Sequence, residues 1–325
     1  MVSVSRSKWA ELSESNPHRT IGLEVLDHLM RLEFGTLPIS RLGFKREVSP
    51  AHVFHDLYRQ KNPRYRNQLD DIDTNELPFY DFVSGWVALA QNPGADVADS
   101  IQTPYSASDI LALPGGLGDC IPLPESLCAP DVVVRPVDIQ NPDSGPRLTT
   151  TISPVGSISD PHIDGCGSGL FLVQLFGEKL LFTWPATVRN LEWMEDRHGI
   201  KRGPLKLLSA LQILEGMSIT LLQKNDAVEL EPGMIHAVMS LSSSGIAGWD
   251  FAKASWLLNK DLQRQMLWEA GMAKKQKVGL LSDRYDIGRY LADDLRLWQL
   301  LGEKSDPNTL GMAIGGMLRD IRELM

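Results

Sequence analysis

A series of short apolar segments in the second half of the chain constrains its fold more than any other feature. From Asp131 onward these segments recur at short intervals, separated by turn residues such as Gly, Pro, Asn and Asp. Their shortness and their β-branched residues predict strands rather than helices. They cover residues 132–134, 148–152, 170–176, 179–184, 219–222, 227–230, 235–239 and 246–251. Strands of this number and spacing predict an antiparallel double-sheet jelly roll, the cupin or double-stranded β-helix fold.

Two connections within this region carry their own signals. Gly177 and Glu178 alone separate segments 170–176 and 179–184, which predicts a tight hairpin. The stretch from Arg189 to Gly216 is predicted to be a mostly helical insert.

Helical periodicity marks both flanks of the strand-rich region. The predicted helices run from about residue 20, over 50–60, over about 77–91, and over 258–273, 282–301 and 308–325. Helices of this kind pack on the outside of a sheet or pair two subunits, so a homodimer through the C-terminal helices is possible.

Residues 92–130 are rich in Pro, Gly, Ser and Asp, which is the composition of turns and loops. Such a long loop is either a functional lid or rim, or a partly ordered surface excursion. The chain is therefore predicted to be an α+β protein in three parts. A helical and loop region covers 1–130, the jelly-roll core covers 131–256, and a C-terminal helical region covers 257–325.

The charge of the chain argues against direct nucleic-acid binding. The formal net charge is −9, and the run Lys274-Lys275-Gln276-Lys277 is typical of a solvated helix end. Nucleic-acid binders usually carry a basic face or stripe.

An intracellular compartment, cytoplasmic or nuclear, fits the cysteine content. Cys120, Cys128 and Cys166 give neither a disulfide framework nor a Cys-based zinc site. The first residues lack the apolar core of a signal peptide. No apolar run approaches the roughly 18–20 residues of a membrane helix, so no membrane association is expected.

The segment Asp160-Pro161-His162-Ile163-Asp164-Gly165 contains the first part of a candidate metal site. Side chains at i and i+2 of an extended segment point the same way, so His162 and Asp164 can reach one ion. A His-x-Asp alone arises by chance fairly often, and a surface turn would then explain it.

His236 follows Pro232-Gly233 at the start of a late predicted strand and supplies a second imidazole. Two imidazoles and one carboxylate on one face of a metal leave three positions open, as in non-haem iron(II) sites. Four protein ligands would instead close a structural zinc site. The open positions suit a bidentate 2-oxo acid and O₂.

Lys179 lies on an apolar predicted strand soon after the His-x-Asp. Such a strand rarely carries a lysine inward without an anionic partner. The distal carboxylate of 2-oxoglutarate would supply one, and Ser159 is a candidate hydroxyl for the same group. A solvent-facing hairpin residue is the alternative for Lys179.

These motifs together resemble the JmjC family of 2-oxoglutarate oxygenases, most of all its compact cupin-type hydroxylases. The matching pattern covers roughly residues 132–251. It consists of Ser159-Asp160-Pro161-His162-Ile163-Asp164, Gln174 with Gly177-Glu178-Lys179, Trp184-Pro185, Pro232-Gly233 and His236.

The resemblance implies iron(II) ligands His162, Asp164 and His236. It implies Lys179 and Ser159 for 2-oxoglutarate, and Gln174 is one option for a further polar contact. The expected reaction uses O₂ and 2-oxoglutarate to hydroxylate, or oxidatively demethylate, a protein side chain or small molecule, with release of succinate and CO₂. The alternatives are another cupin-type metalloenzyme, such as a lyase or isomerase, and a non-catalytic binding module.

Overall fold

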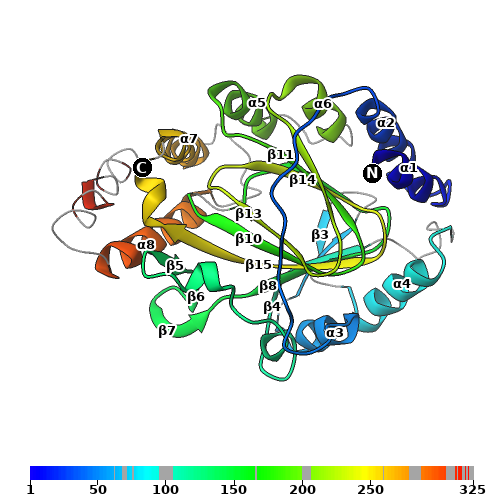
Figure 1. The fold of residues 1–325 in the computed structure, drawn as a ribbon, viewed down its shortest axis with the longest axis horizontal. Coiled ribbons are helices and arrows are strands. Elements are labelled where there is room, and N and C mark those ends of the chain that lie inside the picture. Colours follow the sequence, from blue (N-terminus) through cyan, green and yellow to red (C-terminus); the bar gives the residue numbers. More distant parts are fainter. Residues whose placement is uncertain are drawn as a thin grey trace.

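The computed structural model describes most of the chain. The described residues are 1–61, 63–67, 72–74, 77–94, 105–164, 167–199, 206–258, 260–277, 287–304, 312, 314–316, 319 and 321. Over these ranges the protein is an α+β structure of antiparallel sheets surrounded by helices (Figure 1).

Two sheets form the centre of the molecule. The larger has nine strands in the order β1-β13-β10-β15-β8-β4-β2-β3, with β5 also paired to β15. These strands are β1 (Ser40–Arg41), β2 (Arg64–Asn67), β3 (Ile72–Thr74), β4 (Tyr105–Leu111), β5 (Val132–Val134), β8 (Thr149–Ser153), β10 (Gly169–Phe176), β13 (Asp226–Leu230) and β15 (Ser244–Lys253). The smaller sheet has the order β12-β11-β14-β9. Its strands are β9 (Ile158–His162), β11 (Lys179–Trp184), β12 (Ser218–Leu222) and β14 (Ile235–Ser240).

From β8 to β15 the chain crosses between the two sheets after every strand except β11, which is followed by β12 in the same sheet. β8, β10, β13 and β15 belong to the larger sheet, whereas β9, β11, β12 and β14 belong to the smaller one. A separate two-stranded sheet joins β6 (Pro136–Asp138) to β7 (Asn141–Pro146).

The inner faces of the two sheets enclose an apolar cluster of their own. Its buried members are Leu172, Val228, Leu230 and Ile246 of the larger sheet and Leu181 and Leu222 of the smaller one. Because residues paired across antiparallel strands share a face, the register extends this inner face. Lys179 faces inward with Ser240, Leu181 with Val238, and Thr183 with His236.

Helices cover the outer faces of both sheets. α1 (Val2–Ala10), α2 (Arg19–Leu29), α5 (Val188–Gly199) and α6 (Lys206–Ile213) lie along the smaller sheet (Figure 1). α3 (Pro50–Tyr58), α4 (Phe79–Gln91), α7 (Lys260–Lys277) and α8 (Ile287–Lys304) pack on the larger sheet. Short 3-10 turns occur at Leu117–Asp119, Glu125–Cys128 and Ala254–Leu258.

Burial explains why the sequence of β11 is continuously apolar. All six of its residues are buried, because β11 lies inside the smaller sheet with helices on one side and the larger sheet on the other. Strands covered on both faces do not show hydrophobic alternation.

Three expectations from the sequence are wrong. β10 and β11 do not form a hairpin, because β10 pairs with β13 and β15 whereas β11 pairs with β12 and β14. Residues 1–130 contain strands as well as helices and loops, since β2, β3 and β4 extend the larger sheet. β4 lies inside 92–130, which was expected to be loop. The other predicted strands and the helical insert are present, and the predicted helix 308–325 falls mostly outside the described residues.

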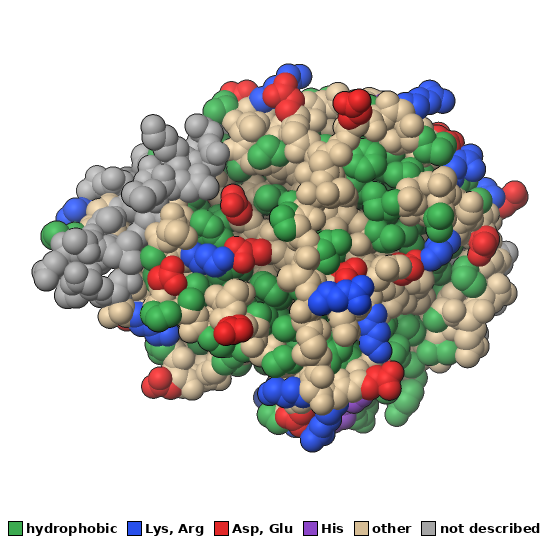
Figure 2. All heavy atoms as spheres, viewed as in Figure 1, with side chains coloured by type: hydrophobic (Ala, Val, Ile, Leu, Met, Phe, Trp, Pro, Cys, Tyr) green, Lys and Arg blue, Asp and Glu red, His purple; other side chains and the backbone are tan. Residues whose placement is uncertain are grey.

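No helix of the described residues is long and apolar enough to cross a membrane. On the face shown in Figure 2, acidic and basic side chains are interspersed rather than gathered into one patch.

Candidate metal centre

His162, Asp164 and His236 converge at one end of the two sheets. His162 ends β9, Asp164 follows it in the connecting loop, and His236 lies near the start of β14 directly opposite His162 in the register. Their ligand atoms all lie within 4.8 Å of one another. Among the described residues this is the only group of three or more His, Cys, Asp or Glu side chains so placed.

The distances match those of ligands around a single small cation. Nε2 of His162 lies 3.2 Å from Oδ1 of Asp164, and Nε2 of His236 lies 3.3 Å from Oδ2 of the same carboxylate. Metal–ligand bonds of about 2.1 Å place adjacent ligand atoms roughly 3 Å apart. The three side chains therefore fit a divalent metal without a large rearrangement.

Backbone carbonyls orient both imidazoles. Nδ1 of His162 lies 2.6 Å from the carbonyl oxygen of Asp160, and Nδ1 of His236 lies 3.3 Å from that of Met234. When Nδ1 carries the proton and donates it to the carbonyl, Nε2 keeps its lone pair for a metal. Both rings therefore present the correct nitrogen to the shared centre.

The site is open on one side. The His236 side chain is 5% exposed, whereas His162 and Asp164 are 39% and 45% exposed. Burial would raise the pKa of Asp164, but the two imidazoles hold that pKa well below its usual value. Burial and Arg66 lower the pKa of His162, but Asp164 outweighs them and raises it. The Asp164 carboxylate thus lies as an anion between the two imidazole rings, and the centre is open to solvent on one side.

Lys179 lies on the same inner face, beyond the apolar residues Leu181 and Val238. It is 2% exposed, and its Nζ donates to Ser153 Oγ at 3.3 Å and to Ser240 Oγ at 3.2 Å. Burial lowers its pKa to about 7. No carboxylate of the described residues pairs with this ammonium. An ammonium has three donors, so one is left for an incoming group.

Ser159 and Gln174 share this inner face but are not the hydrogen-bond partners of Lys179. Ser159 lies opposite Val238 in the register. Gln174 is fully buried, and its Nε2 donates to the carbonyl of Phe176 at 2.7 Å. Its Oε1 is buried with no hydrogen-bond partner among the described residues.

Sequence reasoning missed the two serines that contact Lys179. Ser153 ends β8 and Ser240 ends β14, and neither lies close to Lys179 in the sequence. Ser244, opposite Ser153 in the β8–β15 register, is a third buried hydroxyl on this face. Only the pairing between strands brings these residues together, so no local motif could have identified them.

Asp250 lies on the same face of β15 as Ile246, at the metal end. Its Oδ2 is 3.0 Å from Nε of the buried Arg135. Burial raises the pKa of Asp250, although Arg135 and Arg147 oppose the shift. Its neighbours Trp249 and Phe251 are buried in the core outside the larger sheet. Asp250 is therefore the polar residue of this strand near the candidate metal.

Comparison of the chain with family models and with curated protein sequences finds no match.

Proposed function

We propose that this chain is an Fe(II)- and 2-oxoglutarate-dependent dioxygenase that hydroxylates, or oxidatively demethylates, a protein side chain or small molecule. One observation carries the proposal. A His-Asp-His group with an exposed side lies on one inner face with a buried lysine that has no carboxylate partner among the described residues, and apolar side chains separate the two. The first suits a metal with open positions, and the second suits the far carboxylate of a co-substrate.

The strand order supports a jelly-roll core. Strands β8 to β15 divide equally between two facing antiparallel sheets, and the chain crosses between the sheets after every strand except β11. Eight strands in two sheets are typical of a jelly roll. The expected core therefore spans the part of the chain in which the JmjC-like motifs occur.

His162, Asp164 and His236 would hold the metal. Two imidazoles and one carboxylate are the donor set of non-haem iron(II) oxygenases, and they leave room for other ligands. Bound iron(II) with 2-oxoglutarate supplies the means to insert one atom of O₂ into a C–H bond, with succinate and CO₂ as products.

Lys179 would bind the distal carboxylate of 2-oxoglutarate, with Ser153 and Ser240 orienting its Nζ. Ser159 lies on the same face between His236 and Ser240, so its hydroxyl is a further candidate contact. A buried ammonium is costly unless it is paired, so an anion that reaches it gains a strong interaction.

The apolar side chains between the two polar ends exclude water. Leu181, Val238 and Ile246 belong to the cluster enclosed by the sheets. A dry environment strengthens the interaction of the lysine with a carboxylate and protects a reactive centre from side reactions.

Spectroscopy under argon tests the proposal. Purified protein with Fe(II) and 2-oxoglutarate is expected to show a weak visible charge-transfer band. Folded, metal-loaded protein without that band would overturn the proposal.

Substitution of Lys179 distinguishes the proposed function from the alternatives. Lys179→Ala should abolish the charge-transfer band under the proposed function. A cupin-type lyase or isomerase would not need Lys179, and a non-catalytic module would show no turnover of 2-oxoglutarate. Lys224→Ala is the matched control, because Lys224 is exposed and pairs with Glu47 at the surface.

A further inference from the structure

Two connecting segments deliver ligands to the candidate metal centre, and both contact the C-terminal helices. The loop after Asp164 reaches Gly167, and the turn before His236 contains Gly233. Both glycines have positive φ, +91° and +77°. Neither segment belongs to a strand at that point, so pairing within the sheets does not fix either of them.

The first contact is a hydrogen bond from α8. The indole Nε1 of Trp298 donates to the carbonyl oxygen of Gly167 at 2.9 Å, and Trp298 is fully buried. A Cβ at Gly167 would also lie 3.0 Å from Met266 of α7. Gly167, three residues after the ligand Asp164, therefore contacts one residue from each C-terminal helix.

The second contact lies under the turn before His236. Gln265 of α7 is fully buried, and its Oε1 is the atom that a Cβ at Gly233 would strike first. Its Nε2 donates to Glu269 Oε1 at 2.8 Å, one turn further along α7. This bond holds the Gln265 side chain against the turn.

An ion-pair group attaches α8 to the metal end of the larger sheet. Arg135 contacts Asp294 of α8 and lies 3.0 Å from Asp250 of β15. Asp294 and Trp298 are four residues apart, so they share one face of α8. That face therefore contacts Gly167 directly and is joined to β15 through Arg135.

We propose that the C-terminal helices position the metal ligands, and that Trp298 is the principal positioning residue, with Met266 and Gln265 in support. This inference rests on the proposed metal site. Removing a group that hydrogen-bonds a metal ligand directly typically costs 10–100-fold in metal affinity, and Trp298 acts one step further out, through the backbone of Gly167. The C-terminal region thus belongs to the functional unit of the site and is more than a cover for the sheet.

The test uses Trp298→Phe in the full-length chain, which keeps an aromatic ring but removes the donor to Gly167. Trp86→Phe is the matched control, because Trp86 is also buried and its indole N–H has no hydrogen-bond partner among the described residues. Co(II) affinity by titration calorimetry and the visible spectrum of the Co(II) protein are measured for both. We expect Trp298→Phe to bind Co(II) up to about tenfold more weakly with an altered spectrum, and Trp86→Phe to match the wild type.

Hydrogen exchange, measured on the metal-free protein, complements the titration. Hydrogen exchange of a peptide spanning residues 160–170 should be faster in metal-free Trp298→Phe than in the wild type, and unchanged in Trp86→Phe. If Trp298→Phe does not fold, Gln265→Leu replaces it and should weaken Co(II) binding in the same direction.

The outcomes distinguish this inference from the proposed function. Wild-type protein that binds no Co(II) contradicts the metal site itself. Wild-type binding together with unchanged affinity, spectrum and exchange in the folded variant overturns the positioning role alone.

Discussion

At the scale of single residues, the burial of Lys179 suits the proposed binding of a carboxylate but lowers the free energy of unfolding. The pKa of this buried lysine is lowered from 10.5 to about 7 by burial. Lys179 therefore binds a proton more tightly in the unfolded protein than in the folded protein. The resulting loss of stability is fully present below pH 7 and disappears as the pH rises toward 10.5.

Lys179→Met should therefore stabilise the protein without ligand. Each unit of pKa shift corresponds to about 1.4 kcal/mol, so we expect a gain on the order of a few kcal/mol in the free energy of unfolding at pH 6. The gain should shrink as the pH rises to 9. Urea unfolding at several pH values measures it, and a variant less stable than the wild type at pH 6 would contradict the burial argument.

The same pKa predicts how 2-oxoglutarate binding depends on pH. A bound carboxylate raises the pKa of Lys179, so binding takes up a proton between the free and bound values. Affinity should therefore fall by up to about tenfold per pH unit above pH 7. Calorimetry in two buffers of different ionisation enthalpy measures both the affinity and the proton uptake. Constant affinity and no proton uptake between pH 7 and 9 would speak against Lys179 as the anchor.

The candidate ligands could be predicted at this scale, but the residues that contact Lys179 could not. His162 and Asp164 form a local motif, and His236 follows a recognisable Pro-Gly turn. Ser153 and Ser240 reach Lys179 only through the pairing of distant strands. The sequence shows which residue types are present, but it does not show which residues of distant strands lie opposite one another.

At the scale of elements, the predicted hairpin shows what local spacing leaves undetermined. Gly177 and Glu178 form a connection short enough for a hairpin, yet they carry the chain from one sheet to the other. Gly177 adopts a φ of +71°, and a Cβ there would lie 2.6 Å from Ser244 Cβ. The close approach of β15 determines the path of the chain at Gly177. Because β15 lies far along the sequence, local spacing could not predict this path.

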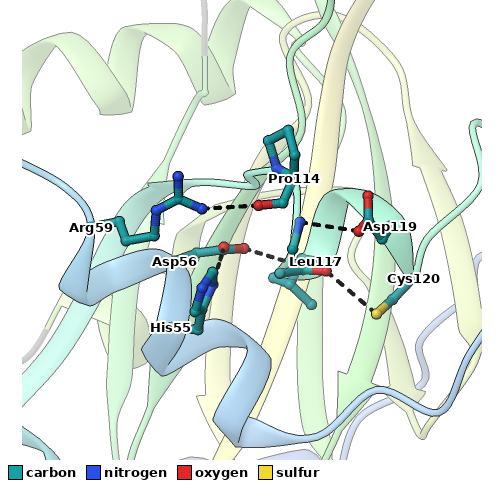
Figure 3. A network of polar contacts seen from close by, with 9 residues as sticks. His55, Asp56, Arg59, Pro114, Leu117, Asp119 and Cys120 are labelled. Carbon is teal, nitrogen blue, oxygen red and sulfur yellow. Dashed lines mark hydrogen bonds and ion pairs between the residues drawn. The ribbon is translucent and has the colours of Figure 1, made fainter.

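A buried carboxylate holds another element in place. Asp56 of α3 accepts a hydrogen bond from Leu117 N–H at 2.9 Å and one from His55 Nδ1 at 3.2 Å (Figure 3). A Cβ at Gly116 would collide with this carboxylate. Asp56 thus fixes the turn at 114–120 against α3.

Asp56→Ala should destabilise the protein by about 1–3 kcal/mol, because it leaves the buried Leu117 N–H without an acceptor. Asp119→Ala is the control, since the exposed Asp119 carboxylate also accepts a backbone bond, from Gly115 N–H at 3.0 Å. The control should cost no more than about 0.5 kcal/mol. Thermal or urea unfolding compares the two, and equal costs would show that Asp56 does not anchor the turn.

At the scale of the whole molecule, the order of strands and helices was largely predictable and the extent of the larger sheet was not. Apolar segments identified β5, β8 and β10 to β15, and helical periodicity identified most of the described helices, whereas β9 was not predicted. β2 and β3 were missed because they are short segments that become strands only by adding to an existing sheet edge, and β4 was missed because it lies in a stretch rich in Pro, Gly, Ser and Asp.

Metal binding should stabilise the whole fold. A ligand present at 100 times its dissociation constant adds about 2.7 kcal/mol to the free energy of unfolding. We therefore expect Co(II) or Mn(II) to raise the melting temperature by several degrees, and a chelator to reverse the change. Asp164→Ala should remove the response. Equal shifts in the variant and the wild type would indicate binding elsewhere.

Strand β14 carries His236 and Ser240 on one face, and the spacing between them has a consequence for selectivity. At about 3.3 Å per residue, a spacing of four residues separates the two positions by about 13 Å. The flexible stem of Lys179 shortens that gap only within limits. The proposed site should therefore discriminate by the length of its dicarboxylate, favouring the five-carbon 2-oxoglutarate over four-carbon oxaloacetate and six-carbon 2-oxoadipate.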